Sequence, residues 1–237
     1  MGRRLPPHVR RAARWLLPGA DRRRRPRWGN LRSLRPFSDD FGWERGLPVD
    51  RVYIEGFLSQ HADAIRGTCL EVLDDAFTRL HGAGAVTQID VCDIDPTNLH
   101  ANVIADLGEP GSLPLQRYDC VVLTQTAHLV PAATECLRNA YAALAPGGVL
   151  LLTVSTVSPH HPERDGDVWR LTPTGLAHLL EAALPAAAER TVEGYGNLVT
   201  ATALLHGVVA AELKPREVAH HDPRYPVIAA ARVRRPS

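Results

Sequence analysis

The chain has 237 residues, of which 45% are hydrophobic, and a formal net charge of +1 at neutral pH. This length suits one domain plus an extension, and the apolar fraction is enough for a packed core. No apolar run reaches the ~20 residues of a membrane-spanning helix, and the arginine-rich start is unlike a secretory signal, so we expect a cytoplasmic protein.

The four cysteines have no C-x-x-C spacing, which is the usual sign of a zinc or redox site. They are Cys69, Cys92, Cys120 and Cys136. Three of them lie in or next to predicted buried strands. We therefore expect core thiols in a reducing compartment rather than a disulfide framework.

Positive charge is concentrated at the N-terminus. Residues 1–35 contain twelve arginines and one acid, a net charge of +11, so the remainder of the chain carries −10. We predict a basic, partly helical extension over residues 1–40, with an amphipathic helix over residues 9–17, and a separate domain over residues 41–237. The extension either is a solvated arm or meets an acidic partner protein or an anionic surface.

The domain begins with a predicted helix over residues 49–65. Asp50 can cap its start, and apolar residues recur at helical spacing along it. On this helix Arg51 and Glu55 are four residues apart and could pair on the surface, while Tyr53 could pack in the core.

Three apolar runs follow, over residues 68–73, 85–91 and 101–107, and each predicts a short buried strand with an acid near its end. The acids are Glu71, then Asp90 or Asp93, then Asp106. Open α/β sheets bind ligands at the carboxyl ends of their parallel strands. These carboxylates therefore predict a ligand site at that edge, suited to the hydroxyls and base of a nucleoside.

A fourth strand is predicted over residues 118–126, a helix over 132–144 and a fifth strand that ends at Val154. Gln125 and His128 lie at the end of the fourth strand. The loop over residues 155–170 is rich in reactive side chains, among them His160, His161, Trp169 and Arg170. We expect it to cover the ligand site, although Trp169 could instead close the core and Arg170 pair with a carboxylate. Because histidine titrates near neutrality, His128 and then His160 are the candidates to accept a proton.

The C-terminal part predicts a helix that begins near Thr172, a strand over residues 190–195, a long helix over 198–213 and a closing strand over 225–233. Tyr195 ends the sixth strand near the expected site. His220 and His221 are adjacent on a loop with no third ligand nearby in the sequence, so we expect surface residues and no metal.

Several of these segments resemble class I S-adenosylmethionine-dependent methyltransferases. The spaced acids and the fourth strand contribute, and residues 144–150, Leu-Ala-Pro-Gly-Gly-Val-Leu, are similar to the L-x-P-G-G-x-L turn before the fifth strand of that family. Residues 45–58, which begin Arg-Gly-Leu-Pro-Val-Asp-Arg-Val-Tyr-Ile-Glu, resemble the opening of a bacterial subgroup. The resemblance covers residues 41–234 and implies a Rossmann-like α/β fold, with seven strands in the order 3-2-1-4-5-7-6 and the seventh antiparallel.

The resemblance also implies S-adenosylmethionine as cofactor and a role for each candidate residue. Glu71 would orient the amino-acid end, Asp90 or Asp93 would accept the ribose hydroxyls, and Asp106 with Leu107 would contact adenine. Arg45, Arg51 and Tyr53 would be the candidates to hold the methionine carboxylate of the cofactor, and Asp74 and Gln125 would make further cofactor contacts. Acceptor contacts would come from His161, Trp169, Arg170 and Tyr195.

One departure concerns the loop after the first strand, which is glycine-rich in the family but has no glycine here over residues 72–77. Asp74 and Asp75 tolerate left-handed backbone angles better than most residues, so the turn can form. Three functions stay open: a methyltransferase for a small molecule such as a sugar or a carbohydrate-linked metabolite, a non-catalytic module that binds a partner through its basic arm, or a nucleic-acid methyltransferase. The acidic domain argues against the third.

Overall fold

The computed structural model describes residues 29–160 and 167–237, and the chain divides into two units, residues 1–35 and 36–237. The smaller unit contains one described turn of 3-10 helix, η2 (Gly29–Arg32). The helix predicted over residues 9–17 lies outside the described residues. No helix in the described ranges is long and apolar enough to cross a membrane.

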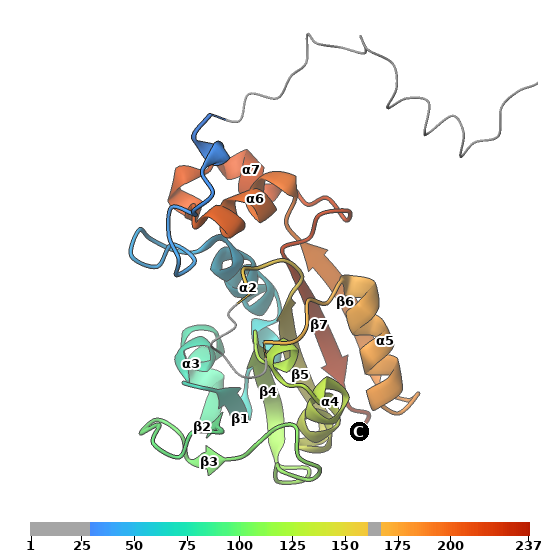
Figure 1. The fold of residues 1–237 in the computed structure, drawn as a ribbon. Coiled ribbons are helices and arrows are strands. Elements are labelled where there is room, and N and C mark those ends of the chain that lie inside the picture. The colour runs from blue at the N-terminus through green and yellow to red at the C-terminus, as the bar shows by residue number, and fades with distance from the viewer. Residues whose placement is uncertain (1–28, 161–166) are drawn as a thin grey trace, which may run out of the picture. The chain divides into compact units, whose positions relative to one another are not determined.

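The larger unit is built on a seven-stranded sheet with the order β3-β2-β1-β4-β5-β7-β6 (Figure 1). The strands are β1 (Gly67–Val72), β2 (Val86–Asp93), β3 (Val103–Ile104), β4 (Tyr118–Thr124), β5 (Leu144–Ser155), β6 (Glu189–Tyr195) and β7 (Ile228–Arg234). The neighbouring strands in the run β3-β2-β1-β4-β5 pair in parallel, and β7 runs antiparallel to both β5 and β6. The predicted strand order and the antiparallel seventh strand are confirmed.

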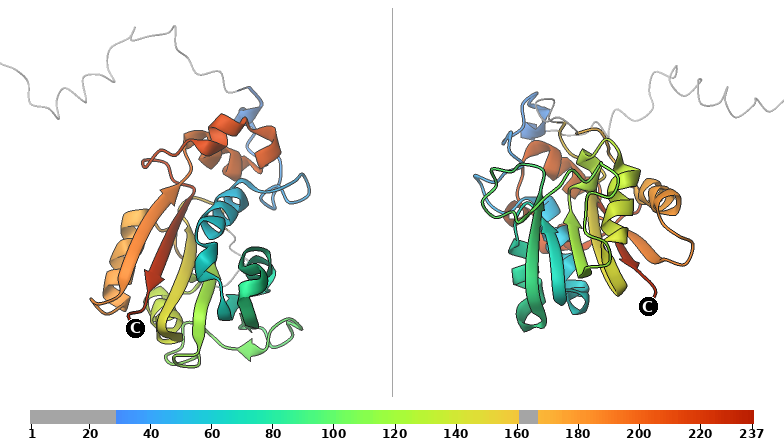
Figure 2. Two further views of the ribbon diagram at one scale, coloured as in Figure 1. Left: turned by 180° about the vertical axis from the view of Figure 1, so that it is seen from behind. Right: turned by 90° about the horizontal axis from the view of Figure 1, so that it is seen from below.

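Helices cover both faces of the sheet (Figure 2). On one face lie α4 (Ala133–Ala142) and α5 (Pro173–Ala183), and on the other lie α2 (Val49–Gln60), α3 (Ala76–Gly82) and α6 (Leu198–His206), with α7 (Pro215–Ala219) beside α6. Successive strand residues point to opposite faces, so Leu70 and Leu150 enter one core while Cys69 and Leu151 enter the other. This double burial explains why the strands are continuous apolar runs.

The four cysteines are free and buried, as predicted. Cys69 and Cys120 are opposite each other on β1 and β4, and Cys92 and Cys136 lie in the core on the other face. Burial raises the pKa of the Cys92 thiol to about 11 and that of Cys136 to about 12. These thiols are therefore protonated and unreactive at neutral pH.

Several element boundaries differ from the predicted ones, for local reasons. The helix predicted to reach residue 213 ends at His206, because Gly207 takes a left-handed φ of 66°. Strand β3 has two residues, and before it the Asn102 side chain, instead of backbone, accepts the Val91 N–H at 2.7 Å. Strand β2 continues to Asp93, two residues beyond its predicted end.

Candidate functional site

A cavity of about 710 Å³ lies at the carboxyl ends of the parallel strands. The ends of β1, β2, β4 and β5 contribute to its wall, together with the start of α2 and the segment before it. The sheet order reverses between β1 and β4, and open α/β sheets bind ligands at such a point. The volume is within the range of small-molecule sites.

Nine of the predicted site residues line this cavity. They are Arg51, Glu71, Asp74, Asp93, Asp106, Leu107, Gln125, His128 and Arg170. Arg51 comes from α2, and the others come from the ends of β1, β2 and β4 and from the connections that follow the strands. The topology therefore brings together the acids that the sequence places at successive strand ends.

Six predicted site residues do not line the cavity: Arg45, Tyr53, Asp90, His160, Trp169 and Tyr195. The remaining predicted site residue, His161, lies outside the described residues. Arg45 forms an ion pair with Glu212. Tyr53 is 4% exposed on the core side of α2, and its hydroxyl donates to the Val218 carbonyl at 3.0 Å.

Tyr195 belongs to a cluster of rings that includes side chains of α2. Its ring centroid lies 6.3 Å from that of Phe57 and 5.3 Å from that of His221. Its hydroxyl donates to Glu193 at 2.7 Å. The partly buried side chain thus supports the packing of α2 on the sheet, since it packs against the core residue Phe57.

Asp90 is a buried carboxylate within β2, 1% exposed. It accepts hydrogen bonds from Gln88, Asn102 and Tyr118 at 2.9, 3.0 and 3.1 Å. Arg117 pairs with it at 2.8 Å. Because β2 continues for three more residues, Asp93 rather than Asp90 reaches the cavity.

The turn after β1 forms without glycine. Leu73 takes the left-handed conformation, with φ of 78°, and its side chain is 62% exposed. The expectation that Asp74 or Asp75 would take it is wrong, since neither has a positive φ. Asp74 instead accepts the Ala76 N–H at 2.9 Å, a local bond typical of a short polar side chain at a turn.

Glu71 connects this turn to the next helix. Its carboxylate accepts the N–H of Phe77 at 3.1 Å and of Thr78 at 2.7 Å, both in the first turn of α3. These amides would otherwise have no intrahelical partner. Burial raises the pKa of Glu71, an effect that the hydrogen bonds from Thr78 partly offset. The carboxylate thus shapes the cavity wall as well as lining it.

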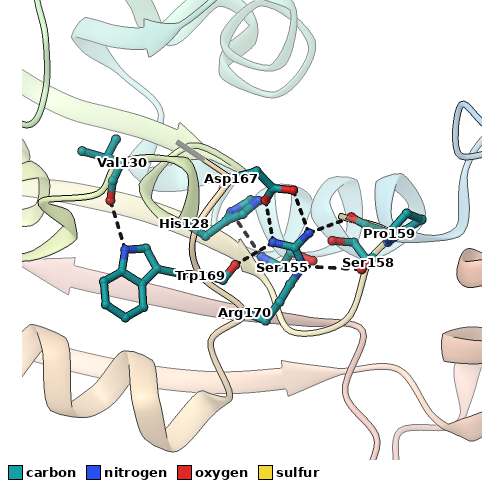
Figure 3. A network of polar contacts seen from close by, with 8 residues as sticks. All are labelled: His128, Val130, Ser155, Ser158, Pro159, Asp167, Trp169 and Arg170. Atoms are coloured by element: carbon teal, nitrogen blue, oxygen red, sulfur yellow. Dashed lines mark hydrogen bonds and ion pairs between the residues drawn. The ribbon is translucent and has the colours of Figure 1, made fainter. Parts of the chain in front are cut away.

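His128 lies in a 3-10 turn, η5 (Ala127–Leu129), and is 6% exposed. Its Nδ1 accepts the Ser155 N–H at 3.4 Å (Figure 3). Burial lowers its pKa to about 4, and the nearby Arg170 charge acts in the same direction. The ring is therefore neutral at pH 7 with its proton on Nε2, which suits a hydrogen-bond donor better than a proton acceptor.

Arg170 is held by hydrogen bonds from all five of its N–H groups (Figure 3). Two go to the Asp167 carboxylate, at 2.6 and 3.0 Å. The others go to the carbonyls of Ser158, Pro159 and Trp169, at 3.5, 2.6 and 2.8 Å. Arg170 therefore fixes the wall segments on either side of it and has no N–H left for a ligand.

Trp169 and His160 do not line the cavity. Trp169 is 40% exposed, and its Nε1 donates to the Val130 carbonyl at 3.2 Å (Figure 3). Its backbone N–H donates to the His128 carbonyl at 3.1 Å, so Trp169 braces the turn that carries His128. His160 is exposed.

Several residues of the cavity wall are not among the predicted site residues. Asp50, which the sequence predicts only as a helix cap, lines the cavity, and so does Asp167, which lies three residues before Arg170. Four hydroxyl residues near the ends of β4 and β5 also line the cavity, although the sequence assigns none of them a role: Thr124, Thr126, Ser155 and Ser158. Their positions at the ends of neighbouring strands were the available signal.

Comparison with known proteins supports the fold and the family. A family model described as a methyltransferase domain matches residues 60–214. The match begins after residues 45–58, so it does not cover the opening that resembles a bacterial subgroup. No curated protein sequence matches the chain significantly.

Three solved structures show the same fold at low identity. A SAM-dependent methyltransferase from Archaeoglobus fulgidus has a TM-score of 0.52 at 14% identity, over 81% of this chain and 96% of its own. One from Mesorhizobium loti has 0.52 at 15%, over 79% and 98%. The N-methyltransferase NodS from Bradyrhizobium japonicum WM9, in complex with S-adenosyl-L-homocysteine, has 0.50 at 18%, over 84% and 94%. With a family match over more than half of its length, the chain belongs to the methyltransferase domain family.

Proposed function

We propose that this methyltransferase uses S-adenosylmethionine and methylates a small-molecule acceptor. One observation carries the proposal: the acids Glu71, Asp93 and Asp106, from three successive strand ends, line a single cavity. Carboxylates accept hydrogen bonds from ribose hydroxyls and from an adenine amino group. The likeness to S-adenosylmethionine-dependent methyltransferases gives further support.

Asp93, at the end of β2, and Asp106, after β3, have free acceptor positions that suit the ribose and the adenine of a nucleoside. Asp93 accepts the Asp95 N–H at 3.0 Å through Oδ1 and the Asn98 amide at 2.6 Å through Oδ2, and each oxygen keeps a further lone pair for a ribose hydroxyl. Asp106 uses Oδ1 for the Gly108 N–H at 2.7 Å and is exposed beside the buried Leu107. A polar acceptor beside an apolar side chain suits the edge and face of adenine.

The cofactor would supply a methyl group on a sulfonium centre, open to in-line displacement by an acceptor nucleophile. The chain's own residues then orient the acceptor and exclude water. His128 would offer its Nε2–H to the acceptor as a hydrogen-bond donor, because its Nδ1 already accepts the Ser155 N–H and its lowered pKa makes it a poor proton acceptor. Arg170 acts as a positioning residue, because it fixes Ser158 and Asp167 in the wall.

A neutral, hydroxyl-rich acceptor, such as a sugar or a carbohydrate-linked metabolite, suits the rest of the wall. Uncharged polar side chains gather near the ends of β4 and β5: Thr124, Gln125, Thr126, Ser155 and Ser158. The wall also contains seven acids and two arginines, a balance that repels phosphate groups and disfavours nucleic acid as acceptor.

Calorimetric titration with S-adenosylhomocysteine tests the cofactor, and transfer of a labelled methyl group to a panel of neutral sugars and nucleosides tests the acceptor. We expect binding in about the micromolar range, typical of enzyme sites, and transfer to a neutral polyol. Binding without transfer to any acceptor would favour a non-catalytic module. No binding would remove the proposed cofactor.

A further inference from the structure

Asp50, in the first turn of α2, has a carboxylate oxygen that accepts no hydrogen bond from the described part of the chain. The residue lines the cavity, and its Oδ1 is buried without a hydrogen bond from any described residue. Burial raises its pKa above the usual value for aspartate, although the neighbouring Arg51 charge acts against this. A buried carboxylate oxygen with no donor is costly. Its position in a cavity wall indicates that a ligand supplies the missing donor.

Arg51, the next residue, presents the opposite charge in the same wall. Its guanidinium lies 5.4 Å from the ring centroid of Trp43 and 5.7 Å from that of Phe77, so two aromatic faces hold it. The ion pairs of the described residues include none for Arg51. Neighbouring positions on α2 thus offer an acceptor and a forked donor to the cavity.

The charge of the cavity wall favours a cationic group near Asp50. Five further acids line it beyond Asp50 and the Arg-paired Asp167, namely Asp40, Glu71, Asp74, Asp93 and Asp106. Among the described residues no cluster of three or more side chains is arranged to hold a metal ion. A cation that needs only one or two oxygen acceptors, such as an organic ammonium group, fits this wall better.

We infer that Asp50 receives the ammonium group, and Arg51 the carboxylate group, of an α-amino acid moiety on the bound ligand. The inference rests on the proposed function, whose cofactor ends in such a group. The position agrees with it: Arg51 lies over Phe77, whose N–H bonds to Glu71 at the end of β1. Arg45 and Tyr53 are engaged elsewhere, so Arg51 is the arginine of this segment that faces the cavity.

Three ligands separate this contact from the rest of the cofactor site. S-adenosylhomocysteine has both charged groups, its desamino analogue lacks the ammonium group, and 5′-methylthioadenosine lacks the whole amino-acid end. We expect Asp50→Asn to weaken S-adenosylhomocysteine binding by about 10- to 100-fold, the scale of a charge-assisted hydrogen bond, and to leave 5′-methylthioadenosine binding unchanged. Glu55→Gln is the matched control, because Glu55 is an acid on the same helix that does not line the cavity.

Two further measurements separate a binding role from a structural one. Wild-type protein should discriminate S-adenosylhomocysteine from its desamino analogue, and Asp50→Asn should lose this discrimination. The melting temperature of ligand-free Asp50→Asn should equal or exceed that of wild type, because the substitution removes an unpartnered buried carboxylate.

Each remaining outcome has a distinct meaning. Unchanged S-adenosylhomocysteine affinity in Asp50→Asn, or no discrimination by wild type, overturns the inference and leaves the proposed function standing. Parallel loss of both nucleoside ligands with a lower melting temperature shows a structural role and also overturns it. Wild-type protein that binds none of the three ligands overturns the proposed function and this inference together.

Discussion

Asp93 and Asp90 lie three residues apart on β2 but in different surroundings. Asp93 ends the strand at the cavity, while Asp90 is buried among Tyr118, Asn102 and Arg117. We predict that Asp93→Asn lowers S-adenosylhomocysteine affinity by about 10- to 100-fold at nearly unchanged stability. Asp90→Asn should instead lower the free energy of unfolding by about 2–4 kcal/mol, because it disrupts a buried network.

Calorimetry and urea unfolding of both variants measure these effects. The assignment fails if Asp93→Asn binds like wild type, or if Asp90→Asn loses affinity without losing stability.

His128 should give a characteristic pH dependence of stability. Its pKa falls from 6.5 to about 4 on folding, so the unfolded chain binds a proton that the folded chain does not between these values. The stability contributed by the neutral ring is thus present above pH ~6.5 and is lost as pH falls toward ~4. We expect His128→Gln to flatten the unfolding free energy over this window relative to wild type, as measured by urea titrations at several pH values. Parallel pH profiles for the two proteins would show that His128 titrates normally.

At the scale of elements, strand positions and their order followed from the sequence, because buried parallel strands are continuous apolar runs with acids after them. Boundaries did not follow as well. The end of β2 depends on pairing with a two-residue edge strand, and the end of α6 depends on one left-handed glycine, Gly207. Side-chain direction was predicted only in part: the helical pattern of α2 left open whether Tyr53 packs in the core, and it did not show that Asp50 turns to the cavity.

The turn after β1 offers a direct test of how this chain does without glycine. Leu73 is left-handed and largely exposed, so Leu73→Gly removes a strained side chain with little loss of packing. We expect the free energy of unfolding to rise by up to ~1 kcal/mol and cofactor affinity to persist. Leu80→Gly is the control, because Leu80 is equally exposed, at 63%, but helical in α3, and should lose about 1 kcal/mol. A loss of similar size in both variants would show that Leu73 is not strained.

At the scale of the whole molecule, the positively charged segment and the residues of the hydrophobic core occupy different parts of the chain. Residues 1–35 carry a net charge of +11, while the two described core clusters consist of residues between Val49 and Val233. The acidic cavity wall belongs to the larger unit. We propose that the basic segment contacts an acidic protein or an anionic surface, since it adds nothing to the described core.

Removing residues 1–35 should therefore separate two properties of the protein. We expect the fragment of residues 36–237 to keep its melting temperature within about 2 °C and its affinity for S-adenosylhomocysteine, because the core clusters and the cavity wall are retained. Binding of the full chain to anionic vesicles at low salt should be lost, because the remaining charge is −10. Scanning calorimetry, titration and vesicle sedimentation measure the three effects, with neutral vesicles as the control. A fragment that folds but no longer binds the nucleoside would show that the basic segment completes the cofactor site, and a fragment that melts well below the full chain would show that the segment stabilises the fold.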